Sequence, residues 1–303
     1  MSLEVTVIIV NYNTGDLISR CIDSVLNQQN IQFEIIVVDN VSMDNSIEVL
    51  KKYEQKKHII LVENQKNVGF GCANNQIEKI AQAKYLFLLN PDCIMNDNLS
   101  LRHCVDYMDK HSEVGMAGTR IFEPRKNRMV KAQVTYPCEK NLKHTATFAH
   151  LPGNIAWILG ASMIISKNIY QQADGFDPDF FLYGEETDLC LRIRKNGYEI
   201  AIIDNVCVEH YSGASERQSS PKEIYLRKQQ GFYQFCRKHY NIKDVVGLAK
   251  KNLWRSRIKL IFLNFLALYN TKKFSPKVQR LYANIQAAKE CIESLSLVKD
   301  DNK

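Results

Sequence analysis

The hydrophobic positions in the first half of the chain form short apolar runs separated by stretches of helical periodicity. The runs are rich in β-branched residues and short enough to be buried strands. Between the first two runs, apolar residues recur every three or four positions from Leu17 to Leu26, which predicts a helix. This alternation predicts an α/β fold with a mostly parallel central sheet and helices on both faces. The predicted strands cover residues 5–10, 34–38, 59–62, 85–89 and 116–121, and the predicted helices cover 17–26, 44–53, 71–83 and 98–111.

The second half of the chain predicts one more strand, a helix before it and a helical C-terminal segment. The strand covers residues 198–208, and the helix begins near Glu185 and continues through Ile193. After Ser220-Pro221 the composition becomes basic and helical. We therefore expect a domain at residues 1–218 and a helical extension at 219–303.

Polar side chains follow each of the first four predicted strands. In an open α/β sheet the ligand crevice lies beyond the carboxyl ends of the strands, so these residues are candidates for a binding site. Asn and Asp also favour turns, which explains one such strand end more easily than four in succession. The four segments are Asn11-Tyr12-Asn13, Asp39-Asn40, residues 64–67 and Asn90-Pro91-Asp92.

Three carboxylates, Glu185, Glu186 and Asp188, are crowded into four positions at the start of a predicted helix. Carboxylates this close repel one another, and two kinds of site use them. One binds a divalent cation, and the other holds a carboxylate at a raised pKa so that it takes a proton from a substrate hydroxyl. The positive end of the helix dipole also favours acidic residues there without any catalytic role. The cluster taken alone leaves these interpretations open.

Composition indicates a globular protein with an acidic front and a basic back. The 303 residues are 45% hydrophobic, and the net charge is +7. From Arg217 onward there are 19 Lys and Arg against 6 Asp and Glu, whereas the preceding residues contain 21 against 27. The nine cysteines form no CxxC pair, which argues against a zinc or disulfide framework. We find no secretory signal and no apolar run of spanning length, so we expect a cytoplasmic protein with reduced, mostly buried thiols.

Five ordered segments within residues 4–240 resemble family-two glycosyltransferases of the GT-A fold, and they are most similar to the bacterial rhamnosyltransferase-like branch. Each segment is unspecific by itself, and their order makes the resemblance specific. The resemblance implies that residues 1–95 hold a nucleotide-sugar donor and that residues 96–218 hold the acceptor. The segments are residues 7–13 (VIIVNYN), 38–44 (VDNVSMD), 67–75 (NVGFGCANN), 89–92 (LNPD) and 181–189 (FLYGEETDL).

The resemblance implies that the strand ends of the first half bind the nucleotide. Asn11 and Tyr12 would border the base and ribose, and Asp39 would accept a hydrogen bond from the pyrimidine N3–H. Uracil and thymine both present this N3–H, so Asp39 does not distinguish UDP from dTDP. The resemblance implies dTDP-rhamnose as the sugar donor, with a UDP-hexose as the second choice. The residues expected at the nucleotide are Asn11, Tyr12, Asp39, Asn40, Asn67, Gly69, Asn75 and Asn90.

The resemblance also implies a divalent cation, Mg²⁺ or Mn²⁺. Relatives carry Asp-x-Asp after the fourth strand, and the cation held there neutralises the leaving diphosphate. In this chain Asn90 replaces the first Asp, which leaves Asp92 as the charged candidate. His210 stands where several relatives place a histidine at the metal or diphosphate, and a histidine that merely follows a strand is the alternative.

The resemblance turns the acidic cluster into a candidate for acceptor activation. In an inverting transfer one carboxylate removes the acceptor proton as that oxygen attacks the anomeric carbon. We expect Glu186 to be this base, with Asp188 as the competing assignment and Glu185 as an orienting neighbour. Trp157, Gly160 and Ala161 belong to a segment that resembles the lining of the sugar and acceptor cavity; a buried strand is the alternative.

The basic extension has two interpretations. Cations at residues 250–259 and 272–273 flank an apolar stretch at 260–269, an arrangement typical of a helix at the interface of an anionic membrane. We therefore expect residues 245–273 to contact the inner face of the plasma membrane peripherally. Packing on the catalytic domain or in a homodimer is the alternative. We find no sequence motif for nucleic-acid binding.

Together these features predict an inverting, metal-dependent glycosyltransferase that acts on a glycan or lipid-linked acceptor in bacterial surface polysaccharide synthesis. The alternative is a catalytically silent module that binds a sugar nucleotide or glycan, because Asn90 and Glu186 depart from the family pattern. The glycines at residues 69 and 71 do not match a dinucleotide-binding fingerprint. A nucleotidyltransferase would need a glycine-rich basic loop after the first strand, where the chain has Asn11-Tyr12-Asn13-Thr14.

Overall fold

A computed structural model describes residues 2–56, 58–139, 142–213, 216, 219–267 and 271–300. The chain forms two compact units. The first comprises Met1–Tyr136, His150–Phe181 and Glu185–Ser215, and the second comprises Pro137–Ala149, Leu182–Gly184 and Glu216–Lys303. The predicted α/β class with C-terminal helices is confirmed.

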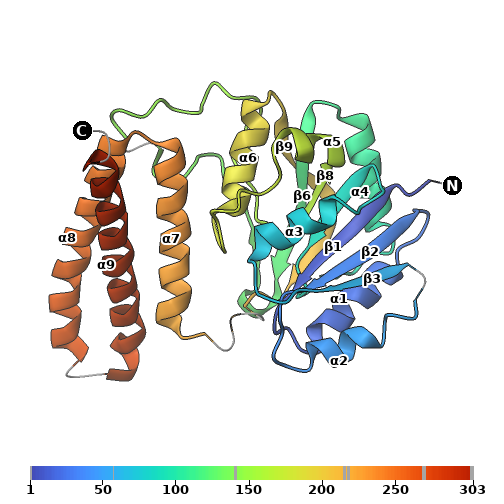
Figure 1. Cartoon of the computed structure of the whole chain (residues 1–303), viewed down its shortest axis with the longest axis horizontal. Helices are drawn as coiled ribbons and strands as arrows, with labels where there is room; N and C mark the ends of the chain where they lie inside the picture. Colours follow the sequence, from blue (N-terminus) through green and yellow to red (C-terminus); the bar gives the residue numbers. More distant parts are fainter. Residues whose placement is uncertain are drawn as a thin grey trace. The chain divides into compact units, whose positions relative to one another are not determined.

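The first unit contains a nine-stranded sheet (Figure 1). Its strands are β1 (Val5–Asn11), β2 (Phe33–Asp39), β3 (Ile59–Glu63), β4 (Tyr85–Leu89), β5 (Cys93–Met95), β6 (Val114–Glu123), β7 (Arg128–Val130), β8 (Ser162–Ser166) and β9 (Glu199–His210). The order is β3-β2-β1-β4-β8-β6-β9-β5, and β7 pairs with β6. The predicted strands are all present. β5 and β7, three residues each, were not predicted because runs this short have no readable period.

The direction of the strands decides which ends meet at one edge. β1, β2, β3 and β4 are parallel to one another. β8 is antiparallel to both β4 and β6, so β6 has the direction of β4, and β9 is parallel to β6. Six of the nine strands therefore run the same way, which agrees with the prediction of a mostly parallel sheet.

Helices cover both faces of this sheet. They are α1 (Leu17–Leu26), α2 (Ser46–Lys51), α3 (Phe70–Glu78), α4 (Ser100–Lys110), α5 (Lys167–Gln172) and α6 (Glu185–Lys195). Alternate residues of a strand point to opposite faces. In β1, Val7 and Ile9 pack in one core with α1, α2 and α4, whereas Ile8 and Val10 pack in another with α3, α5 and α6. Because both faces are buried, the strands are nearly continuous apolar runs.

The second unit contains the three C-terminal helices, α7 (Pro221–His239), α8 (Ile242–Ala267) and α9 (Thr271–Asp300). Both α7 and α8 pack on α9. A capping box starts α7: the Ser220 hydroxyl accepts the N–H of Glu223, and the Glu223 carboxylate accepts the N–H of Ser220. None of the helices in the described part of the chain combines the length and apolar character needed to cross a bilayer.

Two segments from within residues 1–218 belong to the second unit, which differs from the predicted contiguous first domain. Asp244 of α8 accepts the backbone N–H groups of Lys143, His144 and Thr145 at 2.7–3.1 Å. Gly231 of α7 lies so close to Tyr183 that a Cβ there would be 1.9 Å from the Tyr183 carbonyl oxygen. These long-range contacts account for the assignment of Pro137–Ala149 and Leu182–Gly184.

Six of the nine cysteines are buried, as the composition predicts. Cys21, Cys104 and Cys190 lie in the two cores of the first unit. Burial raises the pKa of each of these thiols above its usual range, so they remain protonated. They therefore act as small apolar side chains.

Candidate active site

The predicted strand-end residues gather at one edge of the sheet. Asn11 and Asp39 end β1 and β2 and are direct neighbours in the register of these strands. Tyr12, directly after β1, is half-buried. Asp92 follows β4, and His210 ends β9. Because β1, β2, β4 and β9 run in the same direction, these residues lie at the same edge of the sheet.

Asp39 is buried at the centre of a hydrogen-bond network. Its Oδ1 accepts the Asn11 amide at 2.7 Å and the Ser42 hydroxyl at 2.6 Å, and its Oδ2 accepts the Ser42 N–H at 2.8 Å. A carboxylate accepts about four hydrogen bonds, so the bonds within the described part of the chain leave one acceptor position on Oδ2. Asp39 therefore shapes the loop after β2 and keeps the capacity for one further donor.

Asn40 joins the loops that follow β2 and β3. Its amide nitrogen donates to Asn67 Oδ1 at 2.9 Å and to the Gly69 carbonyl at 3.3 Å. Its oxygen accepts from Asn64 Nδ2 and the Val68 N–H, each at 3.1 Å. Both amide hydrogens and both lone pairs are used. Asn40 thus fixes these two loops through its side chain, and the nucleotide contact expected of it stays a prediction.

Gly69 allows two backbone segments to approach closely. Its φ is 83°, and a Cβ there would be 2.4 Å from the carbonyl oxygen of Phe181. That oxygen accepts the N–H of Phe70, the first residue of α3, at 3.2 Å. One of the backbone N–H groups at the start of α3 is therefore already bonded to Phe181.

Asn75 lies farther along α3 and connects it to the turn after α5. Its amide donates to the Phe176 carbonyl at 2.7 Å, and its oxygen accepts the Tyr170 hydroxyl at 2.5 Å and the Phe176 N–H at 2.9 Å. The tertiary contacts thus give Asn75 a packing role, and the nucleotide contact expected of it stays a prediction.

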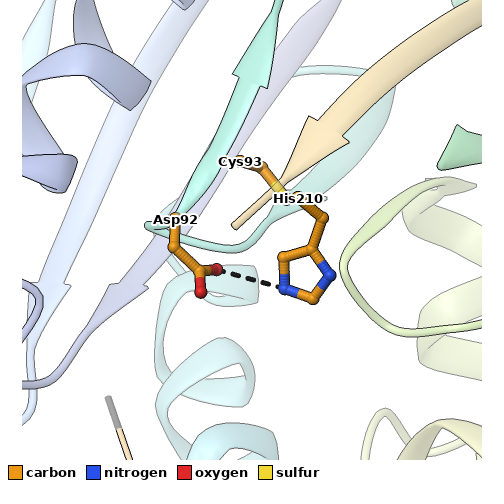
Figure 2. A group of neighbouring side chains, drawn as sticks. All are labelled: Asp92, Cys93 and His210. Carbon is orange, nitrogen blue, oxygen red and sulfur yellow. Dashed lines mark ion pairs between the residues drawn. The ribbon is translucent and has the colours of Figure 1, made fainter. Parts of the chain in front are cut away.

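Asp92, Cys93 and His210 form a group that could hold a metal ion in the described part of the chain (Figure 2). Their candidate ligand atoms lie within 4.8 Å of one another, and His210 Nε2 is 3.2 Å from Asp92 Oδ1. β5 pairs antiparallel with β9, which places Cys93 opposite His210. The three residues therefore come from two segments that only the tertiary fold brings together.

The donor set fits a hard divalent cation through Asp92 and His210. Burial, with a smaller effect of the Asp92 charge, raises the pKa of the Cys93 thiol well above its usual range. Its Sγ donates to the Ala161 carbonyl at 3.4 Å, so Cys93 is a poor ligand for Mg²⁺ or Mn²⁺. His210 Nδ1 is buried and has no hydrogen-bond partner among the described residues. Asp92 and His210 can thus supply an oxygen and a nitrogen.

The turn that carries Asp92 is held by the segment before β8. The Asn90 N–H donates to the Ala161 carbonyl at 2.9 Å, and the Asn90 carbonyl accepts the Cys93 N–H at 3.0 Å. Ala161 is buried. The candidate sugar and acceptor segment therefore lies directly against the candidate donor turn.

The three carboxylates at the start of α6 have different environments. Asp188 is 1% exposed, and its Oδ2 lies 2.8 Å from Nε and 2.7 Å from Nη2 of Arg192. Glu185 is 5% exposed, and its Oε2 has no hydrogen-bond partner in the described chain. Burial raises the pKa of Glu185 well above its usual range, and the charge of Glu186 adds to this effect. Glu186 is the most exposed of the three.

Gly160 connects Glu186 to the donor turn. A Cβ on Gly160 would be 3.3 Å from the Cβ of Glu186. Gly160 is followed by Ala161, which bonds to Asn90, and adjacent Cα atoms are about 3.8 Å apart. The structure thus brings Glu186, Gly160, Ala161 and the Asn90–Asp92 turn together.

Trp157 is part of the wall of the first unit. Its carbonyl accepts the Gln133 N–H at 2.9 Å in an antiparallel bridge, and its side chain packs against a core. The indole Nε1 is buried and makes no hydrogen bond to the described part of the chain. Trp157 therefore packs as part of the wall, and its indole N–H has no hydrogen-bond acceptor among the described residues.

Sequence reasoning missed three residues around these sites. Ser42 bonds to Asp39, Arg192 pairs with Asp188, and Glu123 bonds to Ser212. The first two had a signal: Ser42 lies three residues after Asp39 in a turn segment, and Arg192 lies four residues after Asp188 on a predicted helix. Glu123 had none, because its partners depend on β7 and β9.

Two family models match the chain. The model described as glycosyl transferase family 2 matches residues 6–173, and the model described as glycosyl transferase family group 2 matches residues 92–275. Together they cover the sheet edge, the acidic turn of α6 and the whole of α8.

The individual curated relatives match this chain either over short segments or at low identity. The poly(ribitol-phosphate) beta-glucosyltransferase of Bacillus spizizenii is 34% identical over 104 residues, 33% of this chain and 16% of the relative. The O-antigen chain rhamnosyltransferase RfbN of Salmonella typhimurium is 19% identical over 218 residues, 71% of this chain and 69% of the relative. The first two curated relatives are matched over only 16% and 41% of their lengths.

A solved structure shows the same fold. The mannosyltransferase PcManGT from Pyrobaculum calidifontis, in complex with GDP-Man and Mn²⁺, has a TM-score of 0.59 at 18% identity. The match covers 96% of this chain and 87% of that protein. At this identity the likeness concerns the fold.

Proposed function

Because the chain belongs to glycosyl transferase family 2, we propose that it transfers a sugar from a nucleotide-diphosphate donor to a glycan or lipid-linked acceptor, with inversion at the anomeric carbon. One observation carries this proposal. Glu186 lies beside Gly160, and the next residue, Ala161, bonds to the turn that carries Asp92. A proton acceptor is thereby placed next to a candidate diphosphate site, as a single displacement requires.

The nucleotide is proposed to lie over the ends of β1 and β2. The remaining acceptor position of Asp39 would take the N3–H of uracil or thymine. Asn11, Tyr12 and Asn67 would border it, while Asn40 and Asn75 hold the surrounding structure.

The donor sugar is proposed from the relatives' names. A dTDP-rhamnose donor is supported by the likeness to the rhamnosyltransferase RfbN over 71% of the chain. A UDP-hexose is the second choice, supported by the likeness to the beta-glucosyltransferase over 33% of the chain. The O-antigen and ribitol-phosphate polymers in these names support a role in bacterial surface polysaccharide synthesis, which would place the enzyme in the cytoplasm.

Asp92 and His210 are proposed to hold Mg²⁺ or Mn²⁺, and when bound such a cation neutralises charge on the leaving diphosphate. Glu186 is proposed to take the acceptor proton. Asp188 is unsuited to this role because it is buried against Arg192. Glu185, whose pKa is raised by burial, would remain protonated and support the turn. Trp157, Gly160 and Ala161 would line the sugar and acceptor side.

Nucleotide binding can be tested by thermal unfolding with UDP, dTDP and GDP, each with and without Mn²⁺. A ligand at about 100 times its Kd stabilises the folded state by about 2.7 kcal/mol, which predicts a rise in Tm of about 5 °C for a chain of this size. We expect UDP or dTDP with Mn²⁺ to give this rise. A larger rise with GDP would contradict the proposed role of Asp39.

The alternative function, a silent sugar-nucleotide or glycan-binding module, rests on Asn90 and Glu186, which depart from the family pattern. It predicts the same thermal shift but no turnover of the bound donor. Release of nucleoside diphosphate from a sugar nucleotide, with or without acceptor, would exclude it.

The exposed face of α8 is proposed to contact an anionic membrane. Val245, Ala249 and Ser256 form its buried face. Apolar residues lie on the opposite face at helical spacing, where Trp254 is 65% and Ile261 74% exposed. Exposed cations flank this apolar stripe on both sides, and from residue 245 to 267 the helix has no acidic residue. The stripe consists of Trp254, Ile258, Ile261, Phe262 and Phe265, and the cations are Lys250, Lys251, Arg255, Arg257 and Lys259.

This charge pattern fits negatively charged lipid better than a second copy of the same basic helix. Of the predicted segment 245–273, residues 268–270 lie outside the described residues. A homodimer through the stripe is the alternative, and it would bury the apolar residues while bringing the flanking cations together.

Membrane contact can be tested by flotation of the full chain with vesicles of phosphatidylglycerol and phosphatidylcholine. We expect binding that increases with the anionic fraction and falls at least about tenfold when Trp254, Ile261 and Phe262 are changed to Ser. Ile60→Ser is the matched control, because Ile60 is an exposed isoleucine in the first unit. A wild-type dimer that the triple change dissociates, without vesicle binding, would contradict the proposal.

A further inference from the structure

A basic hairpin ends at the same edge of the sheet as the Asp92–His210 pair. β6 ends at Glu123, a 3₁₀ turn follows at Pro124–Lys126, and β7 returns antiparallel to β6. Asn127 between the turn and β7 has a φ of 45°, a left-handed conformation that Asn adopts more readily than most residues. The hairpin therefore places Arg125 and Lys126 beyond the carboxyl end of β6.

Glu123 is the buried anchor of this hairpin. Its Oε1 accepts Lys126 Nζ and Ser212 Oγ, each at 2.6 Å, and its Oε2 accepts Arg128 Nε at 2.5 Å. Burial alone would raise the pKa of Glu123, but the hydrogen bonds from Lys126, Ser212 and Arg128 outweigh it and lower the pKa to about 2. The ionised carboxylate thus holds the hairpin in one arrangement.

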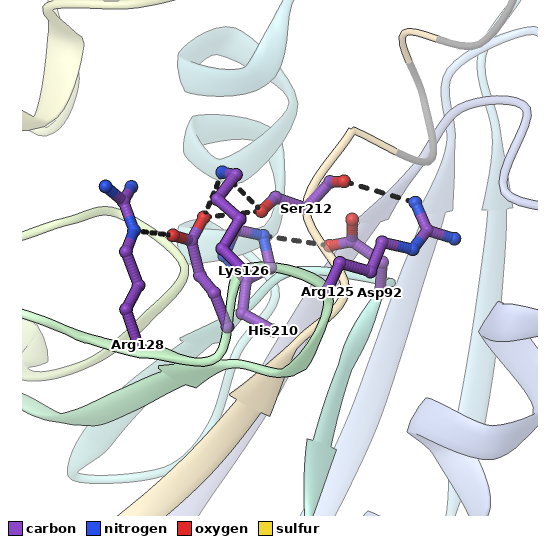
Figure 3. Close-up of polar contacts among 7 residues, drawn as sticks. Asp92, Arg125, Lys126, Arg128, His210 and Ser212 are labelled. Atoms are coloured by element: carbon purple, nitrogen blue, oxygen red, sulfur yellow. Dashed lines mark hydrogen bonds and ion pairs between the residues drawn. The ribbon is translucent and has the colours of Figure 1, made fainter.

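The hairpin is connected to the candidate metal residues through the segment after β9. Arg125 Nη1 donates to the Ser212 carbonyl at 3.5 Å, and Lys126 Nζ donates to Ser212 Oγ at 3.4 Å. The N–H of Tyr211 donates to the Asp92 carbonyl at 3.0 Å. Figure 3 shows Arg125, Lys126 and Ser212 next to the Asp92–His210 pair.

The hairpin contains more cationic residues than carboxylates. Residues 123–128 contain Arg125, Lys126 and Arg128 against Glu123, a formal charge of +2. All three cationic residues are exposed. A guanidinium has five N–H donors, and that of Arg125 uses one for Ser212 in the described chain. The neighbouring turn carries one carboxylate, Asp92, because residue 90 is Asn.

We propose that Arg125 and Lys126 bind a phosphate group beside the Asp92–His210 pair, so that side-chain cations neutralise part of its charge. Arginine and lysine are the side chains best suited to phosphate oxygens, and here a buried carboxylate positions the hairpin that carries them. The inference rests on the proposed function for the origin of the phosphate. That origin is the diphosphate of the donor or a phosphate of the acceptor.

The proposal can be tested by calorimetric titration with inorganic pyrophosphate in EDTA, so that no metal contributes. We expect wild type to bind, Arg125→Ala to bind about tenfold more weakly, and Arg125→Ala/Lys126→Ala to bind about 100-fold more weakly. In these variants Glu123 keeps its bonds to Arg128 and Ser212. Arg120→Ala is the matched control, because Arg120 is an exposed arginine of β6 that also donates to a backbone carbonyl.

Two results would overturn the proposal: no binding of millimolar pyrophosphate by wild type, or equal affinities for wild type and the Arg125→Glu variant. Unchanged thermal unfolding of the variants shows that the fold is intact. Saturating UDP or dTDP abolishes pyrophosphate binding if the phosphate belongs to the donor, and leaves it if the phosphate belongs to the acceptor. Pyrophosphate contains neither sugar nor base, so its binding at Arg125 and Lys126 can be measured even if the protein transfers no sugar. The two proposals can therefore fail independently.

Discussion

Glu186→Gln is expected to lower kcat for sugar transfer by about 10³-fold, the usual effect of removing a general base. Glutamine keeps the size of the side chain, but it cannot accept the proton of the acceptor hydroxyl. The expected Kd for the donor nucleotide is nearly unchanged, because Glu186 lies beside Gly160, on the side proposed for the sugar and acceptor. Single-turnover transfer rates and calorimetric donor titration measure the two quantities separately.

Two neighbouring carboxylates provide matched controls for this experiment. Asp188→Asn should lower the free energy of unfolding, since it weakens a buried ion pair with Arg192, and should change kcat by less than about tenfold. Glu185→Gln should be tolerated near pH 7, because burial raises the pKa of Glu185 and already favours its neutral form. If Asp188→Asn abolishes transfer while Glu186→Gln retains it, Asp188 is the base.

Asp92→Asn is expected to reduce the Mn²⁺-dependent part of donor binding by about 100-fold or more. Asp92 is the carboxylate of the candidate metal group, and an amide oxygen attracts a divalent cation less strongly. Donor titration with and without Mn²⁺ measures this dependence, and unfolding curves of the variant without metal establish that the fold is retained. Full transfer activity of the wild-type enzyme in EDTA would refute the metal role.

Cys93→Ala tests whether the metal is held by a thiolate in addition to Asp92 and His210. The Cys93 thiol is buried, and its pKa is raised well above its usual range, so it should not bind Mn²⁺ as a thiolate. We expect the Mn²⁺ dependence of this variant to equal that of wild type. A loss as large as that of Asp92→Asn would show that the thiol is a ligand.

The order of strands and helices was predictable because burial on both faces leaves a local signature. β1 and β2 are continuous apolar runs, and α1 repeats apolar residues at helical spacing, so each is visible within its own segment. The polar strand ends were predictable for the same reason, since they follow directly on those runs. The short strands β5 and β7 were not, because three residues show no period.

The roles of individual site residues were less predictable. Asn40 and Asn75 belong to motif segments, yet their amides are committed to Asn67, Gly69 and Phe176. Asp188 and Glu186 look equivalent along the chain, and Arg192 distinguishes them. Such differences depend on which side chains come together in the folded protein, and the local sequence around each residue does not predict them.

Local periodicity and motif order were sufficient to predict the α/β class, the family resemblance and the set of polar groups at the strand ends. The folded arrangement was needed to show that Gly160 lies beside Glu186, that Asp92 lies next to His210, and that Glu123 anchors a basic hairpin near this pair. Each of these contacts joins segments that lie far apart along the chain, with other helices and strands between them. Their geometry depends on strand register and direction, which no single segment contains.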